Sequence, residues 1–272
     1  MENKELAKTA NHIRQNIIKM LAEAGSGHPG GSLSCTDILT VLYFDEMRID
    51  PKDPKKASRD RFVLSKGHAA PALYATLAER GYFPEEELWK LRKTSQMLQG
   101  HPDMKHTPGV DMSTGSLGQG LSAANGMALA AKLDGTDVRV YAVAGDGEIQ
   151  EGQIWEAAMS AAHYKLDNVT LFVDHNGLQI DGSNDEVMTV NSIPDKFRAF
   201  GWNVLEINGH DIAAIKEALK AAKTVKGKPT AIVCETVKGK GVSFMENLVG
   251  WHGKAPSKEQ CEEAIKELEA AI

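Results

Sequence analysis

Short apolar segments alternate with longer helical patterns along most of the chain, and this alternation limits the fold more than any other feature. Segments rich in β-branched and apolar residues are expected to be strands, at residues 61–64, 138–143, 169–173, 204–207 and 230–234. Helical spacing of apolar residues is found at residues 71–80, 117–133, 153–164 and 212–224. Strands joined through helices form parallel sheets that are covered on both faces. We therefore expect an α/β fold with a mostly parallel sheet, helices on both faces, and ligands at the carboxyl ends of the strands.

The two ends of the chain add helical patterns to this core. Residues 1–24 form the first pattern, which Gly25 ends, and residues 37–47 form the second. Between them, residues 24–34 read as a loop rich in Gly, Ser and His. Near the other end, Ser257 and Gln260 form a capping-box pair before apolar residues at helical spacing, which are Cys261, Ala264, Ile265, Leu268 and Ile272. We expect one domain over residues 1–272. Residues 238–241 read as a mobile, solvated loop, with closure over a phosphate as the alternative.

Composition and charge exclude several classes of protein. The chain has 31 Lys and Arg residues against 37 Asp and Glu residues, so its formal net charge is −6. Nucleic-acid binding needs clustered basic residues, so nucleic acid is not expected as a partner. No apolar run approaches the roughly 18 residues of a membrane span, and no secretory signal is recognisable at the amino terminus. The three cysteines are widely spaced and form no CxxC pair, which favours a reducing, cytoplasmic location.

Two turns at the expected carboxyl edge of the sheet contain candidate ligand-binding residues. The segment after the strand at 138–143 contains Gly145-Asp146-Gly147, and Asn176 follows the next strand. A Gly-rich turn between a strand and a helix presents backbone N–H groups to a phosphate. The carboxylate of Asp146 would repel that phosphate unless a cation stood between them. Carboxylate and amide oxygens suit Mg²⁺ or Ca²⁺, so the two turns together predict a divalent metal site. On its own, an aspartate between glycines is more often a simple turn residue.

Several motifs around these turns resemble those of transketolases, which use thiamine diphosphate. The matching stretches are SGHPGG (26–31), LSKGHAAPALYA (64–75), GHPD (100–103), TGSLGQGLSAANGMALA (114–130), the frame GDGEIQEG…VDHNGLQIDG, and GWHGKAP (250–256). They follow the order of the family and extend over most of the chain. The resemblance implies the thiamin-diphosphate-binding fold, and specifically the diphosphate-binding domain of the family.

The resemblance also implies a role for individual residues in holding the cofactor. Asp146, Asn176 and the carbonyl of Leu178 would bind Mg²⁺, for which Ca²⁺ or Mn²⁺ could substitute. Gly147 would donate its backbone N–H to the diphosphate. Gly115, Ser116 and Leu117 would pack against the aminopyrimidine ring, although many family members carry proline where this chain has Ser116.

Four histidines in Gly- or Pro-containing loops would serve catalysis. By resemblance, His68 and His252 would contact the diphosphate and line the channel, and His28 and His101 would reach the reacting carbon and the sugar hydroxyls. Imidazole suits these roles because it exchanges protons near neutral pH. A single loop histidine is usually only solvated, but four in matching motifs favour function. Glu151 and Glu156 would lie at the interface between subunits.

The implied activity is transfer of a two-carbon ketol unit from a ketose phosphate to an aldose phosphate, in the pentose phosphate pathway. Transketolases also contain a pyrimidine-binding domain, whose glutamate activates the cofactor, and a third domain, and neither has a counterpart in this chain. The resemblance is therefore to the amino-terminal subunit of a split transketolase, expected to act only with a carboxyl-terminal subunit in a two-plus-two heterotetramer.

Alternative functions remain open from the sequence. The first alternative keeps the cofactor and changes the substrate to an unusual sugar phosphate, or to a reaction like that of 1-deoxyxylulose-phosphate synthase. The second is a non-catalytic binding homologue, which would be expected to lose metal ligands or histidines. A nicotinamide oxidoreductase is weaker, because the turn lacks the three-glycine fingerprint.

Overall fold

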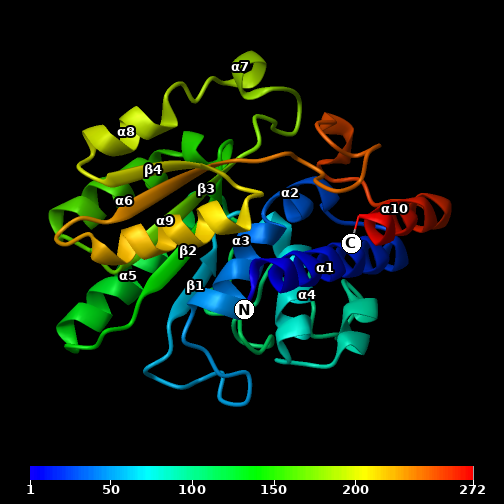
Figure 1. The fold of residues 1–272 in the computed structure, drawn as a ribbon, viewed down its shortest axis with the longest axis horizontal. Coiled ribbons are helices and arrows are strands. Elements are labelled where there is room, and N and C mark those ends of the chain that lie inside the picture. Colours follow the sequence, from blue (N-terminus) through cyan, green and yellow to red (C-terminus); the bar gives the residue numbers. More distant parts are fainter. Residues whose placement is uncertain (272) are drawn as a thin grey trace.

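A parallel sheet forms the centre of the protein, as a computed structural model of residues 1–271 shows (Figure 1). Its five strands have the order β1-β2-β3-β5-β4, and all neighbouring strands are parallel. The strands are β1 (Arg61–Leu64), β2 (Val140–Gly145), β3 (Val169–His175), β4 (Asn203–Asn208) and β5 (Thr230–Glu235). The predicted α/β fold with a parallel sheet is confirmed.

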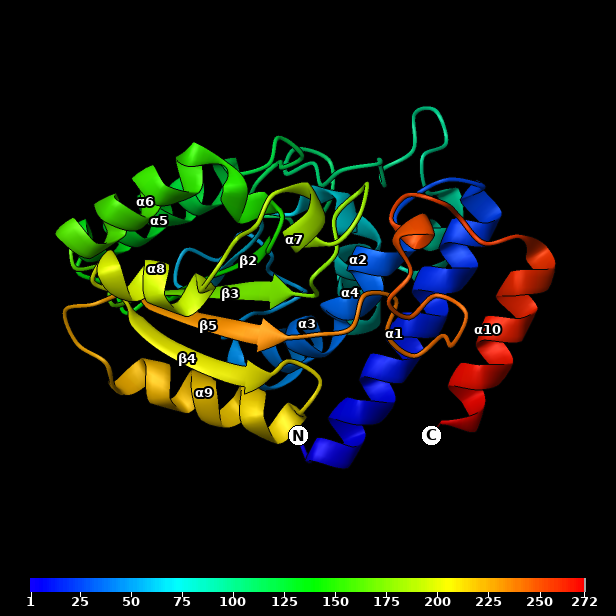
Figure 2. The same cartoon turned by 90° about the horizontal axis from the view of Figure 1, so that it is seen from above.

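Helices cover both faces of this sheet because successive strand residues point to opposite sides. In β2, Tyr141 and Val143 belong to one hydrophobic cluster, whereas Val140, Ala142 and Ala144 belong to another. The first cluster is covered by α1 (Asn3–Ala24), α3 (Thr36–Val41), α4 (Ala70–Arg80) and α9 (Ile212–Thr224). The second is covered by α5 (Gln119–Leu133), α6 (Gly152–His163) and α8 (Ile193–Ala199). Figure 2 shows the sheet between α9 and the pair α5 and α6.

The remaining helices lie around the ends of the sheet. They are α2 (Pro29–Ser34), α7 (Asn184–Val187) and α10 (Lys258–Ala270). Short 3-10 helices occur at Gly67–Ala69, Glu85–Lys90, Glu148–Gln150 and Val249–Trp251, and one π-helical turn, Leu42–Glu46, continues α3.

The two terminal helices pack side by side (Figures 1 and 2). The amide of Asn11 in α1 donates a hydrogen bond of 2.8 Å to the carbonyl of Leu268 in α10. The predicted capping box is present, because Ser257 Oγ accepts from the Gln260 N–H at 3.2 Å and Gln260 Oε1 accepts from the Ser257 N–H at 3.0 Å. The apolar spacing extends this helix to Ile272, which lies outside the described residues.

Two parts of the sequence-based assignment are wrong. The sequence pattern places residues 29–34 in a loop, but they form α2, with Pro29 in its first turn. The glycines of this helix allow close packing: a Cβ on Gly30 would lie 2.9 Å from the Trp251 carbonyl oxygen, and one on Gly31 would lie 3.2 Å from His68 Nε2. Strand β2 also begins two residues later than expected and includes Gly145, which pairs with Asp174 of β3.

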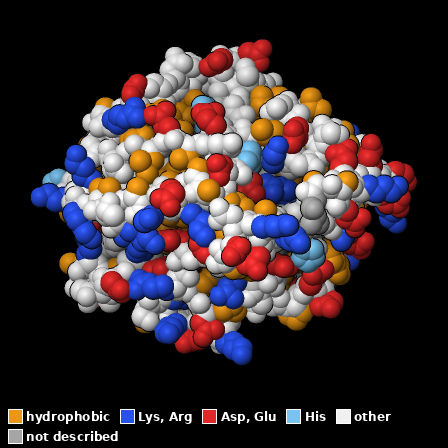
Figure 3. Space-filling model, viewed as in Figure 1, with side chains coloured by type: hydrophobic (Ala, Val, Ile, Leu, Met, Phe, Trp, Pro, Cys, Tyr) orange, Lys and Arg blue, Asp and Glu red, His pale blue; other side chains and the backbone are white. Residues whose placement is uncertain are grey.

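The surface carries mixed charge. On the face that Figure 3 shows, acidic and basic side chains are interspersed, with hydrophobic side chains in small groups between them. Within residues 1–271, no helix combines the length and the apolar character needed to cross a membrane.

Candidate active site at the carboxyl edge of the sheet

The two turns singled out in the sequence lie next to each other at one edge of the sheet. Strands β2 and β3 are neighbours, Gly145 pairs with Asp174, and the Asp146 N–H donates to the Asp174 carbonyl at 3.2 Å. The Asp146 carboxylate accepts hydrogen bonds from the N–H groups of Gly147 (2.9 Å) and Gly177 (2.6 Å). Since Gly177 lies between Asn176 and Leu178, the three predicted metal ligands come together.

The charge of Asp146 is poorly compensated. The residue is 2% exposed, and its carboxylate has no ion pair with a basic side chain among residues 1–271. Burial and the nearby Asp174 charge raise the pKa of Asp146. A buried carboxylate beside amide and carbonyl oxygens fits a hard divalent cation, which would restore the charge balance. The donor set of Asp146, Asn176 and Leu178 therefore fits the metal that the sequence predicts.

Lys238 reaches the same place, and this corrects the expectation of a solvated loop at residues 238–241. The side chain of Lys238 is buried, its Nζ donates to the Leu178 carbonyl at 3.1 Å, and it lies 2.9 Å from His252 Nδ1. The loop turns inward because the Gly239 N–H donates to the Gly30 carbonyl at 3.0 Å. A Cβ on Gly239 would lie 2.4 Å from the Met245 carbonyl oxygen, so this packing requires glycine. Burial and the Lys66 charge lower the pKa of Lys238 to about 8.

Three of the four predicted catalytic histidines form a triangle next to Lys238. Ring centroids are 5.4 Å apart for His28 and His68, 5.6 Å for His28 and His252, and 5.1 Å for His68 and His252. Burial, followed by neighbouring positive charges, lowers the pKa of His28 to about 4 and that of His252 to about 3. The pKa of His68 is lowered for the same reasons. These shifts favour the neutral form of all three rings.

One fully buried ring nitrogen of the triangle, His28 Nδ1, lacks a hydrogen-bond partner among the described residues. A buried polar atom without a partner is costly, which indicates that a ligand or water binds there. The same is true of Thr114 Oγ1, next to the predicted Gly115–Leu117 contact.

His101 lies apart from the triangle, on the exposed rim of the site. Its ring packs on Gly115: a Cβ added to that glycine would lie 3.0 Å from His101 Cδ2. Burial and the charge of Arg92 lower the pKa of His101. The structure thus places His101 with the predicted aminopyrimidine-binding residues and not with the other three histidines.

The turn of Gly115, Ser116 and Leu117 is fixed by Glu148, which sequence reasoning did not single out. Its carboxylate accepts hydrogen bonds from Ser65 Oγ (2.5 Å), the Gly118 N–H (2.9 Å) and the Gly145 N–H (3.0 Å). The turn also packs against the residue before His68, since a Cβ on Gly67 would lie 2.7 Å from the Gly115 nitrogen. Ser116 is exposed and Leu117 is half-buried. The glutamate next to the Gly-Asp-Gly turn was the signal that could have indicated Glu148.

A buried ion pair between Lys66 and Asp174 lies next to the site, and the sequence analysis did not single out either residue. Lys66 Nζ contacts Asp174 Oδ2 and donates to the Gly31 carbonyl at 2.8 Å, and both side chains are at most 1% exposed. Asp174 also accepts from Ser34 Oγ at 2.6 Å and from Thr236 Oγ1. Burial alone would raise the pKa of Asp174, but the Lys66 charge and these hydrogen bonds lower it. The pair joins α2 to the ends of β3 and β5.

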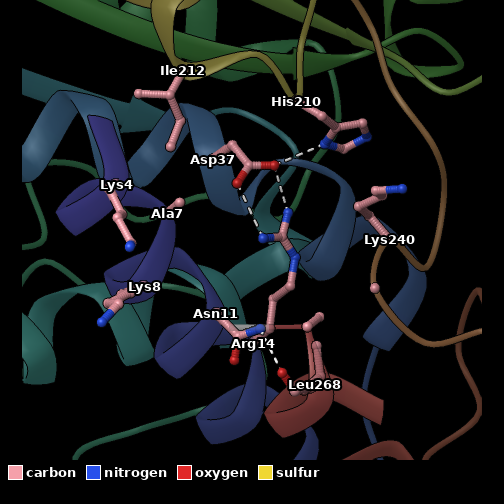
Figure 4. Close-up of a pocket in the computed structure, with 12 residues that line it drawn as sticks. Lys4, Ala7, Lys8, Asn11, Arg14, Asp37, His210, Ile212, Lys240 and Leu268 are labelled. Carbon is pink, nitrogen blue, oxygen red and sulfur yellow. Dashed lines mark hydrogen bonds and ion pairs between the residues drawn. The ribbon is translucent and has the colours of Figure 1, made fainter. Parts of the chain in front are cut away.

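A second network holds the segment that leads to Lys238. Arg14 of α1 donates to the carboxylate of Asp37, which also lies 2.8 Å from His210 Nδ1 (Figure 4). His210 Nε2 accepts from the Val237 N–H at 2.8 Å, so His210 presents its Nδ1 proton to Asp37. These side chains lie on a cavity of about 490 Å³ that contains none of the predicted site residues. The network fixes the backbone one residue before Lys238.

The two predicted interface residues lie on the outer surface. Glu151 precedes α6 and Glu156 lies within it, and both are exposed. Neither side chain has a hydrogen-bond or ion-pair partner within residues 1–271. Glu156 lines a groove of about 300 Å³ between α5 and α6.

The sequence and the fold of this chain are similar to those of known proteins. The family profile described as "Transketolase, thiamine diphosphate binding domain" matches residues 6–270. The chain is 48% identical over 265 residues to a 6-deoxy-6-sulfo-D-fructose transketolase subunit of Clostridium sp. (strain MSTE9), covering 97% of this chain and 96% of that relative. It is 44% identical over 272 residues to an apulose-4-phosphate transketolase subunit of Phocaeicola vulgatus, covering 100% of this chain and 96% of that relative.

The fold of this chain also matches that of solved transketolase structures. The transketolase of Campylobacter jejuni matches with a TM-score of 0.93 at 36% identity, over 99% of this chain and 43% of that chain. The chain thus spans less than half of that transketolase and nearly the whole length of the two subunits above.

Proposed function

Because the chain belongs to the transketolase family, with the thiamine-diphosphate-binding domain at residues 6–270, we propose that it works as the amino-terminal subunit of a split transketolase. Residues 1–272 form a single diphosphate-binding domain in this proposal. The enzyme moves carbons 1 and 2 of a ketose to an aldose: the C2–C3 bond of the ketose breaks, and a new bond forms to the aldehyde carbon. The observation that carries the proposal is the histidine triangle beside the oxygen ligands of the Asp146 turn.

The residues of this chain fit the cofactor. Asp146, Asn176 and the Leu178 carbonyl would hold Mg²⁺. The Gly147 N–H, which donates to the Asp146 carboxylate in the structure, and the buried ammonium of Lys238, which donates to the Leu178 carbonyl, would serve as donors to the diphosphate. When bound, thiamine diphosphate supplies the electron sink that allows the C2–C3 bond to break. Gly115, Ser116 and Leu117 pack on the aminopyrimidine side.

The histidines handle protons and hydroxyl groups. Cleavage of the C2–C3 bond requires the C3 hydroxyl to lose a proton, and bond formation requires a proton to return to the aldehyde oxygen. A neutral imidazole accepts the first proton, and the imidazolium that results returns it in the second step. In this proposal, His28 and His101 carry out these transfers, and His68 and His252 line the channel to the diphosphate. His28 Nδ1, which has no partner among the described residues, supports the role of His28.

Cofactor binding tests the metal assignment. Thiamine diphosphate is titrated with and without Mg²⁺, and binding is followed by the fluorescence of the tryptophans, among them Trp251 next to His252. Asp146→Asn is expected to weaken Mg²⁺-dependent binding by about 100-fold, since it removes the one anionic metal ligand. Asp167→Asn, an aspartate outside the site, is the control. Unchanged binding by Asp146→Asn would show that the metal lies elsewhere.

Turnover tests the histidine assignment. The complex is assembled with the partner subunit that co-purifies with the tagged chain in Mg²⁺ and thiamine diphosphate. His28→Gln is expected to lower kcat for ketol transfer by about 100- to 10,000-fold, the range for loss of an acid–base group, with the cofactor Kd changed less than about threefold. Equal losses in kcat and cofactor affinity would make His28 a binding residue instead.

The substrate is proposed only as a class. The names of the two subunit relatives specify a sulfonated ketose and a sugar phosphate, both of which carry an anionic group. We propose the same class here, a sugar with a terminal phosphate or sulfonate. The pentose phosphate pathway, a reaction like that of 1-deoxyxylulose-phosphate synthase, and a cytoplasmic location stay predictions from the sequence. The intact set of ligands and histidines favours an enzyme over a non-catalytic homologue.

The partner is the carboxyl-terminal subunit, which supplies the pyrimidine-binding domain and its activating glutamate. The names of the relatives, which call each of them a subunit, support such a partner. By the family resemblance, Glu151 and Glu156, which are exposed, would lie at an interface on the α6 surface within a two-plus-two heterotetramer. Sedimentation velocity of the complex tests this, because Glu156→Arg should reduce the assembly while Glu217→Arg on α9 should not. A smaller wild-type particle would contradict the tetramer.

A further inference from the structure

A cavity of about 490 Å³ lies away from the histidine triangle, and the proposed function gives it no role. It is enclosed by α1, α10, the start of α9 and the segment that follows β5. Cavities of this size commonly hold a small organic molecule, lined by apolar side chains with a few polar groups. We therefore ask which chemistry its lining would recognise.

One wall of the cavity is a cationic face of α1. The α1 residues that line it are Lys4, Ala7, Lys8, Asn11 and Arg14 (Figure 4). Their spacing puts them on one side of the helix. Neither Lys4 nor Lys8 has a side-chain hydrogen bond or ion pair within residues 1–271.

The one carboxylate among the described lining residues does not neutralise these lysines. Asp37 accepts hydrogen bonds from two nitrogens of the Arg14 guanidinium and lies 2.8 Å from His210 Nδ1. Burial alone would raise the pKa of Asp37, but the Arg14 charge and the His210 hydrogen bond lower it to about 2. The Asp37 charge thus balances that of Arg14, and the charges of Lys4 and Lys8 are left over.

A buried donor in the same wall lacks an acceptor. Arg14 is 7% exposed, and its Nε–H has no partner among the described residues, although both Nη atoms donate to Asp37. A buried N–H without an acceptor is costly, which indicates that an acceptor atom binds in the cavity. Because Lys4 and Lys8 lie on the same side of α1, an anionic acceptor fits this position best.

The opposite part of the lining is apolar. Ile212 of α9 is 8% exposed and Leu268 of α10 is 1% exposed, and both line the cavity. A small inorganic anion would leave these side chains facing water, whereas an organic anion with an apolar body would cover them. The lining therefore matches a ligand that has an anionic head and an apolar body.

Two contacts connect the cavity with the segment that carries Lys238. The cavity-lining His210 accepts a hydrogen bond of 2.8 Å from the Val237 N–H, one residue before Lys238. Three residues after it, Gly241 lines the cavity itself, and a Cβ there would lie 3.3 Å from Arg14 Cδ. The lining thus holds the chain on both sides of Lys238.

We propose that this cavity is an effector site, which binds a small organic anion with an apolar body and thereby orders the Lys238 segment. The anionic head accepts from Arg14 Nε and from the ammonium groups of Lys4 and Lys8. A ligand that orders a segment lowers the entropic cost of the next ligand, so the effector and thiamine diphosphate strengthen each other's binding by the same factor. Only this coupling rests on the proposed function; binding of the anion does not.

Isothermal titration calorimetry of the full chain with 1-naphthyl phosphate tests the site. Two reference compounds each carry half of the chemistry, inorganic phosphate and uncharged 1-naphthol. The probe is expected to bind at least about 10-fold more tightly than either compound, because it uses both parts of the lining. Saturating Mg²⁺ and thiamine diphosphate should lower its Kd by about fivefold or more.

Two substitutions at exposed positions of α1 locate the probe. Lys8→Gln removes one cation and should weaken binding about 3- to 10-fold. Ala7→Leu places a larger side chain at the cavity wall and should weaken binding by about 10-fold or more. Lys19→Gln, on the same helix but outside the cavity, is the matched control and should change nothing. Urea unfolding of each variant shows whether it is as stable as the wild type, as expected for surface substitutions.

Each contrary result overturns a definite part of the proposal. Probe binding that neither Lys8→Gln nor Ala7→Leu changes, or that thiamine diphosphate abolishes, would place the probe outside this cavity. Equally tight binding of inorganic phosphate would refute the apolar part of the ligand. An equal Kd with and without the cofactor would refute the coupling to Lys238. If the wild-type chain bound no thiamine diphosphate, the proposed function would fail, while the titration without cofactor would still decide the cavity.

Discussion

Replacing one member of the buried Lys66–Asp174 pair should destabilise the protein far more than replacing both. Asp174→Asn keeps the shape of the side chain but leaves the Lys66 ammonium buried without its counter-charge. Lys66→Met leaves the Asp174 carboxylate with only its hydroxyl and amide donors. Removing one partner of a buried pair costs about 3–5 kcal/mol, because the remaining charge is uncompensated.

The double variant shows whether the two residues contribute to stability independently or as a coupled pair. If the residues were independent, the losses would add to about 6–10 kcal/mol, which is most of the 5–15 kcal/mol of a typical protein. If the pair is coupled as the structure shows, Lys66→Met/Asp174→Asn loses no more than either single variant, and the coupling energy is about 3 kcal/mol or more.

The measurement is equilibrium unfolding in urea, followed by far-UV circular dichroism, with equal m-values as the condition for comparison. The matched control is the surface pair of Lys93 and Glu23, whose side chains are each 52% exposed. A double-mutant cycle there should give less than about 1 kcal/mol. Additive losses at Lys66 and Asp174, or single losses as small as the control, would refute the reasoning.

Four further outcomes are expected. Gly67→Ala should lower the free energy of unfolding by about 1–3 kcal/mol and weaken cofactor binding in a titration, because the added Cβ would lie 2.7 Å from the Gly115 backbone nitrogen. Unchanged stability and cofactor affinity would contradict this packing. Ser257→Ala should cost about 1 kcal/mol in urea unfolding through loss of the α10 cap, whereas Lys258→Ala should not. Of the three thiols, only half-buried Cys261 should react with a disulfide reagent in the native protein, and slowly, because burial raises its pKa. The pKa values of His28 and His252 are lowered to about 4 and about 3, so below pH 6.5 the unfolded chain binds more protons than the folded one. The free energy of unfolding should therefore be largest above pH 6.5 and fall towards pH 4. In His28→Gln it should fall less steeply.

The sheet and the main helices could be predicted because each has a local signal. The strand at Arg61–Leu64 and the helix at Ile212–Thr224 have the bounds that the sequence pattern predicts. The capping box at Ser257 was equally visible, since both partners are three residues apart. The α2 helix was missed because Gly30 and Gly31 normally disfavour helices, and the close contacts that need them involve distant segments.

Site residues that lie in short motifs were singled out from the sequence. Site residues whose role depends on burial were missed. The proximity of the Asp146 and Asn176 turns followed from their positions at the ends of two strands, whereas the histidines were grouped by the family resemblance of their motifs. Lys66 and Lys238 read as ordinary charged residues. Their burial depends on partners far along the chain, such as Asp174, which is 108 residues from Lys66. A long side chain whose charge is satisfied by distant residues leaves no periodic signal in a sequence.

The contact between the first and last helices has a consequence for synthesis. The hydrogen bond from Asn11 to Leu268 closes a separation of 257 residues. At about 5–20 residues per second, α1 waits roughly 13–50 s on the ribosome before α10 emerges to cover it. During that time, the apolar face of α1 that meets α10 is open to solvent and to other chains. The packing of α10 on α1 is therefore expected to form only at the end of synthesis.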